Sequence, residues 1–373
     1  MAVYTVSGSQ LSAIYNRSGA GLSYAYDLSG TEIFSGQVPE EPFDKTLVRY
    51  DRTDLITNAW LANAETQRNA VLALYNQSSD AIPFFIQTDG HGRRNEGNKG
   101  AHNLAEPVMR YIWNIQLGDY ASYYADGANA SHHISSSAGL TNYIPVMGNH
   151  EFLNNDSASS QLADLSVLVP AFTPTGAILG SEEQGYYKIV DAENHLKFLV
   201  TQPFNPDATN SSGFDPKYPP DEWRWIISEL SADDGCDIVV LSHYPFYGYY
   251  IDRSDGTTHT SGNPGQTSGF RTSLSTVLAD RKAKRNGSVE DVDGNVYTYD
   301  FTGCTTDLLC CLHGHIHAEW YFDKTQYGYP AYVGDDFDGS GKCAYGLIDR
   351  DGGKLYVYSF SKTELNDPLA LDL

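Results

Sequence analysis

Short apolar runs recur along the middle of the chain, and each one ends at a cluster of polar residues. The runs cover residues 82–86, 111–117, 143–147, 238–241 and 308–312. Continuous apolar runs of this length, bounded by polar residues and glycine, are typical of buried strands. The pattern therefore predicts core strands with a polar segment at the end of each.

Other stretches follow a different periodicity. Apolar residues at helical spacing predict one helix over residues 54–78 and another over residues 221–230. Aromatic and β-branched residues within 331–360 predict closing strands. This alternation indicates an α/β fold, but by itself it does not distinguish one doubly wound sheet from a sandwich of two sheets.

The polar segments at the strand ends carry side chains that bind divalent metals. Such metals take carboxylate oxygen, amide oxygen or imidazole nitrogen, and a metal pair needs a carboxylate that can bridge it. The segments are Thr88-Asp89-Gly90-His91, Gly118-Asp119, Gly148-Asn149-His150-Glu151, Ser242-His243 and Gly314-His315-Ile316-His317. Asp89, Asp119 and Asn149 follow one another at 30 positions, about one strand-helix-strand unit, so parallel strands would bring them to one edge. We therefore expect one shared metal site.

Each polar segment taken alone has a simpler explanation. Asp, Asn and His often satisfy backbone groups at strand ends, with no metal involved. The whole set argues against this explanation, because so many carboxyl, amide and imidazole groups at one sheet edge would be electrostatically costly without a cation.

In this order, the segments resemble the pattern of the calcineurin-like metallophosphoesterases: D-x-H, G-D, G-N-H-[DE], a lone His and G-H-x-H. The resemblance covers roughly residues 80–350 and implies a four-layer sandwich of two mixed β-sheets flanked by helices. It also implies two divalent or trivalent transition-metal ions, of Mn, Fe, Zn or Ni. The implied ligands are Asp89, His91 and His317 for the first metal, Asn149, His243 and His315 for the second, and Asp119 as the bridge between them.

The resemblance further implies metal-dependent hydrolysis of a phosphate ester, either a phosphodiester or a phosphomonoester, or of a pyrophosphate. A hydroxide bridging the two metals held by Asp119 would attack phosphorus, and His150 would be the general acid that protonates the leaving oxygen. The sequence contains no G-x-S-x-G elbow of a serine hydrolase. The family often has a further carboxylate three residues after the bridging Asp, where this chain has Ser122, and Asp126 is a candidate for its place beside His150.

Three further residues are candidates for substrate binding. Arg93 and Arg94 directly follow the first motif and could hold a phosphate bidentately, whereas Tyr247 follows His243 and could stack on a base or sugar. An exposed loop pair is the alternative explanation for the two arginines, whereas for Tyr247 the alternative is the abundance of Tyr in this chain, which has 27 copies. Asp335, Asp336 and Asp338 resemble part of a calcium loop, but no Glu closes it, so we expect a solvated turn.

The first 40 residues differ from the rest. Residues 11–19 are echoed by residues 22–30, with alternating apolar residues and a turn after each copy. We expect a small strand-turn appendage over residues 1–45, beside a metallophosphoesterase domain over 46–373, with self-association or particle attachment through residues 1–40. The repeat resembles attachment modules of phage tails and gut-bacterial surface proteins. This leaves open a second function, an attachment protein whose metal site is mainly structural, and a disordered leader is a further explanation.

The composition limits the classes of molecule that this chain is expected to bind. A formal charge of −23 argues against a long nucleic-acid duplex, since affinity for a polyphosphate backbone depends on Lys and Arg, and leaves a small phosphorylated substrate. No apolar stretch approaches the length of about 18 residues that spans a membrane, and residues 1–21 lack the pattern of a signal peptide, so we expect a cytoplasmic protein as encoded, or one associated with a phage particle. The five cysteines have no zinc-ribbon spacing and are expected to be buried thiols.

Overall fold

The computed structural model describes residues 24–26, 32–35, 56–91, 96–105, 109, 112–120, 133–134, 137, 140–152, 165–203, 217–246, 250–259 and 268–373. Residues 1–49 and 50–373 form two compact units. In the smaller unit, β1 (Tyr24–Tyr26) and β2 (Glu32–Ser35) form an antiparallel hairpin. The first copy of the predicted repeat, residues 11–19, and the predicted boundary between residues 45 and 46 lie outside the described residues.

The larger unit contains two mixed sheets. The six-stranded sheet has the order β19-β18-β17-β3-β4-β5. Its parallel half is β3 (Ala81–Gln87), β4 (Trp113–Leu117) and β5 (Tyr143–Val146), and its antiparallel half is β17 (Cys343–Asp349), β18 (Lys354–Phe360) and β19 (Leu369–Asp372).

The nine-stranded sheet has the order β11-β10-β15-β16-β14-β9-β8-β7-β6. Four central strands are parallel: β8 (Leu196–Val200), β9 (Asp237–Leu241), β14 (Leu308–His313) and β16 (Ala331–Val333). Antiparallel strands flank them: β6 (Ile178–Leu179), β7 (Tyr187–Asp191), β10 (Tyr250–Asp252), β11 (Thr258–His259) and β15 (Trp320–Phe322).

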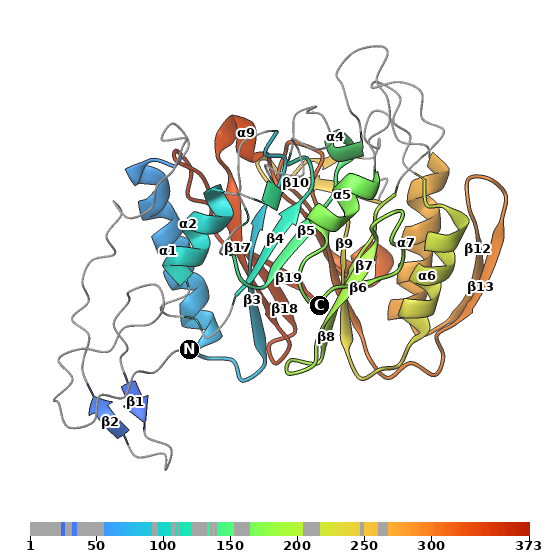
Figure 1. Cartoon of the computed structure of the whole chain (residues 1–373), viewed down its shortest axis with the longest axis horizontal. Helices are drawn as coiled ribbons and strands as arrows, with labels where there is room; N and C mark the ends of the chain where they lie inside the picture. The colour runs from blue at the N-terminus through green and yellow to red at the C-terminus, as the bar shows by residue number, and fades with distance from the viewer. Residues whose placement is uncertain are drawn as a thin grey trace. The chain divides into compact units, whose positions relative to one another are not determined.

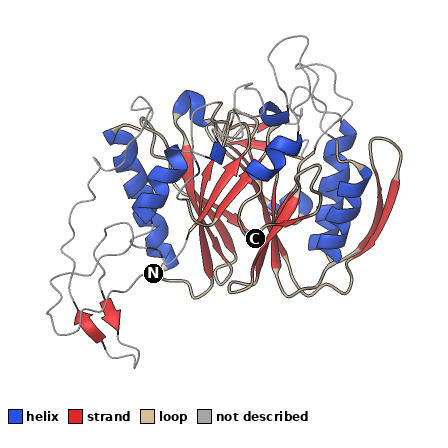
Figure 2. Cartoon of the chain, viewed as in Figure 1, coloured by secondary structure: helices blue, strands red, loops and turns tan. Residues whose placement is uncertain are grey.

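Helices cover the outer faces of both sheets. Figure 1 shows α1 (Asn58–Tyr75) and α2 (Glu96–Ala105) on the six-stranded sheet, and α6 (Pro220–Ser231) and α7 (Ser268–Lys282) on the nine-stranded sheet. A hairpin of β12 (Asn286–Glu290) and β13 (Val296–Asp300) packs beside α6 and α7. The remaining described helices are α4 (Asn149–Phe152), α5 (Leu165–Phe172), α8 (Lys324–Tyr327) and α9 (Phe337–Ser340). The helix-sheet-sheet-helix order in Figure 2 confirms the predicted four-layer sandwich.

Strand β3 explains why most of the predicted strands are apolar at nearly every position; β4 is the exception, because it carries the buried polar residues Asn114 and Gln116. Phe84 belongs to the core between the two sheets, whereas its neighbour Phe85 packs edge-on against Tyr345, with ring centroids 5.0 Å apart, in the layer under α1. Successive side chains of a strand point to opposite faces, so a strand covered on both sides is apolar throughout. A nearly continuous apolar run therefore indicates a strand in a sheet that is buried on both faces.

Most of the secondary structure expected from the sequence is present. The helix expected over residues 54–78 is α1, which is capped by the Thr57 side chain accepting from the Trp60 N–H, and the helix expected over 221–230 is α6. All five cysteines are buried thiols that form no disulfide, as predicted. None of the helices in the described ranges is both long enough and apolar enough to cross a bilayer.

Gly346 allows β17 and β3 to pack closely. It pairs with Phe84, and a Cβ placed on Gly346 would lie 2.1 Å from the Phe84 ring. We expect Gly346→Ala to lower the free energy of unfolding by about 1–3 kcal/mol, the usual range for overpacking. Urea denaturation would measure the change. The matched control is Gly303→Ala, because no atom lies within 4 Å of a Cβ there, and an equal effect of the two substitutions would contradict the packing argument.

Candidate metal centre

The five polar segments meet where the carboxyl ends of β3, β4, β5, β9 and β14 come together. The first three strands belong to the six-stranded sheet and the other two to the nine-stranded sheet. A hydrogen bond joins the two sheets here, because the His315 N–H donates to Asp89 Oδ2 at 2.8 Å, 226 positions away in the chain. The expected convergence on one site is therefore present, at the junction of two sheets.

Two groups of side chains at this junction could each hold a metal ion. The first group is Asp89, His91, Asp119 and His317, and the second is Asp119, His243 and His315. Within each group the candidate ligand atoms lie within 4.8 Å of one another. Asp119 belongs to both groups, which is the position that a bridging carboxylate requires.

The first group is compact around the ring of His317. Its Nε2 lies 2.9 Å from His91 Nε2 and 3.3 Å from Asp89 Oδ1. Asp89 Oδ1 is buried and accepts no hydrogen bond. A buried carboxylate oxygen without a hydrogen bond is costly, and a cation among these atoms would remove that cost.

The second group converges on the Nε2 atom of His243. This atom lies 3.2 Å from Asp119 Oδ2, 3.1 Å from Asn149 Oδ1 and 3.2 Å from His315 Nδ1. His243 Nδ1 lies 2.7 Å from the Leu117 carbonyl oxygen, which can only accept, so Nδ1 carries the proton. In the neutral ring Nε2 then offers a lone pair toward two other oxygens, an arrangement that suits a shared cation.

The charges at the junction also fit metal binding. Burial raises the pKa of Asp119, but His243, His150 and His91 together lower it by more, so the pKa lies well below its usual range and this carboxylate is ionised. Burial lowers the pKa of His315 to about 3, which keeps this ring neutral, as a ligand must be. Burial lowers the pKa of His243 too, but Asp119, Asp89 and the Leu117 carbonyl together raise it by more, to about 9. A metal there would displace the proton of His243.

The backbone of these segments is strained. Eight non-glycine residues in the described ranges have a positive φ, and five of them are Asp89, His91, Asp119, His315 and His317. This conformation is rare outside glycine and gathers at functional sites, where the surrounding structure enforces it. Asp and His adopt this conformation more readily than most other residues, but its concentration at the five candidate ligands indicates the same site.

Close packing holds the segments in place. A Cβ on Gly314 would lie 2.0 Å from Thr88 Oγ1, so only glycine lets the last motif approach the first. Thr88 Oγ1 donates to Asp89 Oδ2 at 2.5 Å. Glu151 is fully buried, and its Oε2 accepts from the backbone N–H groups of Asp119 and Gly148. Thr88 and Glu151 stand inside the motifs, but nothing in the sequence pattern assigned them this positioning role.

His150 lies beside the centre without joining either group. Its backbone N–H donates to Asp119 Oδ1 at 2.9 Å, its Nε2 lies 3.7 Å from Asp119 Oδ2, and its ring centroid lies 4.5 Å from that of His91. The side chain is 15% exposed, so it can reach a bound molecule. A proton donor is expected in such a position, beside the metal-binding groups and outside both.

Some predicted residues cannot be placed. Arg93, Arg94 and Tyr247, expected at the substrate, and Ser122 and Asp126, expected near His150, lie outside the described residues. The expectation of a solvated turn at Asp335, Asp336 and Asp338 was wrong. The segment forms the short helix α9, whose first two backbone N–H groups donate to the Thr88 and Asp89 carbonyl oxygens. The physical reason is that these carbonyl oxygens at the end of β3 need donors, and a helix start supplies them.

The buried carboxyl group of Glu222 is linked by hydrogen bonds, through Gln202, to the end of the strand that precedes Asn149. Glu222 on α6 is fully buried and accepts from the Gln202 N–H at 2.7 Å, and Gln202 Oε1 accepts from the Met147 N–H, just before Asn149. Burial raises the pKa of Glu222 to about 8, so the group is neutral at pH 7. No motif or periodicity in the sequence singled out this pair.

No model of a known protein family matches this chain, and no curated protein has a similar sequence. The function is therefore inferred from the geometry of the centre.

Glu222 should make stability depend on pH. Its folded pKa of about 8 lies above the usual 4.5, so the folded state holds the proton more tightly and the free energy of unfolding falls as pH rises from about 4.5 to 8. The fall should approach about 1.4 kcal/mol per pH unit within that window. Glu222→Gln should remove this contribution, measured by urea denaturation at pH 5, 7 and 9. The exposed Glu182→Gln is the control, and a Glu222→Gln profile parallel to wild type would contradict the assignment.

Proposed function

We propose that this chain is a metal-dependent hydrolase of phosphate esters, similar in its site to the calcineurin-like metallophosphoesterases. The single observation that carries the proposal is that Asp119 belongs to two adjacent groups of metal-binding side chains, with His150 beside both and inside neither. A carboxylate shared in this way serves two cations, and a pair of cations is the usual machinery for in-line displacement at phosphorus.

The residues present fit two transition-metal ions. Asp89, His91 and His317 would hold the first, Asn149, His243 and His315 would hold the second, and Asp119 would contact both. When bound, the pair supplies an activated water as nucleophile and neutralises charge on the phosphoryl oxygens. Imidazole together with carboxylate and amide oxygen suits Zn, Fe, Mn or Ni.

The chain's own side chains would orient the centre and move one proton. Asp119 is ionised and fixed through its backbone by Glu151, so it stays in place during the reaction. His150 would donate the Nε2 proton to the leaving oxygen, because its ring is partly exposed and lies next to the first group. Its backbone hydrogen bond to Asp119 keeps the donor at a constant distance from the centre.

The accessibility of the centre favours catalysis over a purely structural metal site. Structural sites are closed by protein ligands, whereas catalytic sites keep a face open to solvent or substrate. His317 is 44% exposed, and His91 and His150 are partly exposed, whereas Asp89 and His243 are buried. One side of the centre is thus buried in the protein and the other is accessible to solvent. Because a structural metal needs no accessible side, we prefer the hydrolase to an attachment protein with a structural metal.

Metal content tests the shared ligand. We expect wild type to hold about two equivalents of transition metal, and Asp119→Ala to lose both, since it removes the carboxylate common to both groups. Metal analysis after gel filtration measures this, with circular dichroism to establish that the variant is folded. Asp293→Ala in the β12–β13 hairpin is the control and should keep both metals. A variant that retains one equivalent at wild-type affinity would show that Asp119 serves a single cation.

The role of His150 predicts a dependence on the leaving group. His150→Gln should slow alkyl phosphate esters by about 10²–10⁴-fold but slow nitrophenyl esters far less, because an acidic phenol leaves without a proton donor. Steady-state rates on matched esters with metals present measure the effect. His195→Asn is a suitable control, since His195 is exposed and precedes β8 at the opposite end from the centre, and Asn tolerates its positive φ. Equal slowing of both ester classes would remove His150 from the role of general acid.

A further inference from the structure

Asp336 faces the metal centre from outside the two groups. Its Oδ2 lies 3.7 Å from His317 Nδ1, on the side of the ring away from the other candidate ligands. The opposite ring nitrogen, Nε2, is the one that meets His91 and Asp89. His317 is therefore placed between a cation position at Nε2 and a carboxylate at Nδ1.

The carboxylate of Asp336 is fixed by the start of α9. Asp336 is the N-cap of this helix, and its Oδ2 accepts from the Gly339 N–H at 2.9 Å. The backbone N–H of Asp336 donates to Asp335 Oδ1 at 2.8 Å. Because α9 is itself bonded to the end of β3 through the Thr88 carbonyl oxygen, the cap is tied to the first metal-binding motif.

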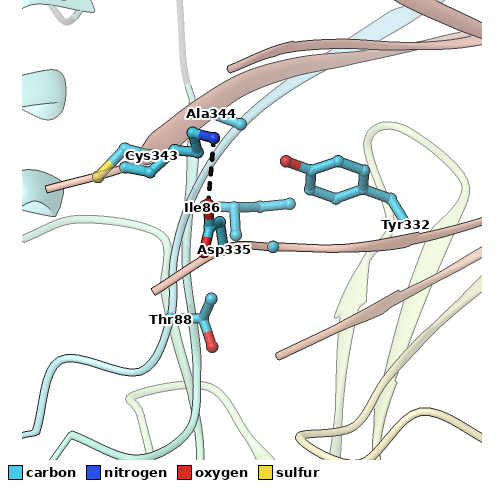
Figure 3. Close-up of a pocket in the computed structure, with 8 residues that line it drawn as sticks. Ile86, Thr88, Tyr332, Asp335, Cys343 and Ala344 are labelled. Carbon is cyan, nitrogen blue, oxygen red and sulfur yellow. Dashed lines mark ion pairs between the residues drawn. The ribbon is translucent and has the colours of Figure 1, made fainter. Parts of the chain in front are cut away.

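A charged cluster anchors the same segment to both sheets. Lys342, which precedes β17, lies 3.1 Å from Asp335, which follows β16, and 2.8 Å from Glu364. Lys342 and Asp335 line the same pocket as Thr88, and Figure 3 labels Asp335 and Thr88 there, with the ion pair drawn as a dashed line. The Lys342 side chain is only 12% exposed, so solvent screens these pairs less than it would at an open surface. The chain around Asp336 is thus held from the six-stranded and the nine-stranded sheet together.

We propose that Asp336 is a positioning residue for His317. Its carboxylate lies 3.7 Å from Nδ1, which is too long for a hydrogen bond but close enough to attract the Nδ1–H electrostatically. This attraction favours the tautomer with a bare Nε2 and orients Nε2 toward the first metal. The inference rests on the proposed use of His317 as a ligand. It adds a residue that touches neither metal nor substrate and that stands outside the five metal-binding segments of the sequence.

The physical reason lies in the exposure of the ring. His317 is 44% exposed, whereas Asp89 and His243 are fully buried, so packing alone does not fix its orientation. A ring that can rotate loses conformational entropy when it binds a metal. A carboxylate at the other nitrogen restricts the ring before the metal binds, so less entropy is lost on binding. Loss of such a partner typically lowers metal affinity by about 10–100-fold.

The chain offers a matched control for the capping role. Asp323 caps α8, another helix of four residues, and its side chain accepts from the Thr325 N–H in the same way. Asp323 belongs to neither metal-binding group. Replacing Asp323 therefore reports the cost of losing an Asp cap without any effect on a ligand.

The experiment uses the full chain and compares Asp336→Ser, Asp336→Asn and Asp323→Ser with wild type. Serine keeps a capping oxygen but is too short to reach the ring, whereas asparagine keeps an acceptor of the same length. Zn²⁺ affinity at each site would be measured by chelator competition, and the Nδ1–H resonance of His317 by NMR of the zinc-loaded protein. We expect Asp336→Ser to weaken one site about 10–100-fold and the other less than about threefold, Asp336→Asn to lie between it and wild type, and Asp323→Ser to change neither.

Three results would overturn the inference: unchanged affinity in Asp336→Ser, an equal loss at both sites, or the same loss in Asp323→Ser. Affinity is measured without turnover, so the inference and the proposed function fail separately. A wild type that binds two metals but hydrolyses no phosphate ester overturns the hydrolase proposal alone. A wild type that binds no metal at these residues overturns both.

Discussion

The structure depends on burying two ionised carboxylates at the junction of its sheets. Asp89 and Asp119 are at most 1% exposed, and each acts on the other as a like charge. Two buried negative charges are tolerated only when positive charge lies close by. The surrounding imidazoles supply some of that charge, and two metal cations would supply it fully. The histidines, the strained backbone and the close glycine contact at Gly314 all serve this one electrostatic requirement.

The sandwich makes such a junction possible. Parallel strands from both sheets end at the same place, so side chains from β3 and β4 meet side chains from β9 and β14 without any long loop to carry them. Ligands held at strand ends move less than ligands on loops, and this matters for a centre where displacements below 1 Å change reactivity. The hydrogen bond from His315 to Asp89 is the direct link between the two sheets at this point.

The environment gives the carboxyl groups around the centre different tasks. Asp119 faces histidines and is ionised, whereas Glu222 is fully buried and holds its proton at pH 7. Glu151 uses its carboxylate on two backbone N–H groups, and Asp336 divides its own between a helix cap and a histidine ring. The environment of each carboxyl group thus decides whether it is ionised, and therefore which atoms it can hold in place.

The sequence by itself determined the elements and the donor chemistry. Apolar runs marked β3, β9 and β14, helical spacing marked α1 and α6, and residue types at the strand ends marked a metal site, because periodicity and side-chain chemistry are local properties. The family resemblance implied two sheets and a shared Asp119, but only the tertiary structure shows which strands belong to each sheet and brings Asp119 within reach of both groups. The tertiary structure also decided the roles of Glu222 and Asp336, which the spacing of residues in the sequence does not predict. Burial and contacts between residues far apart in the chain arise only when the sheets pack.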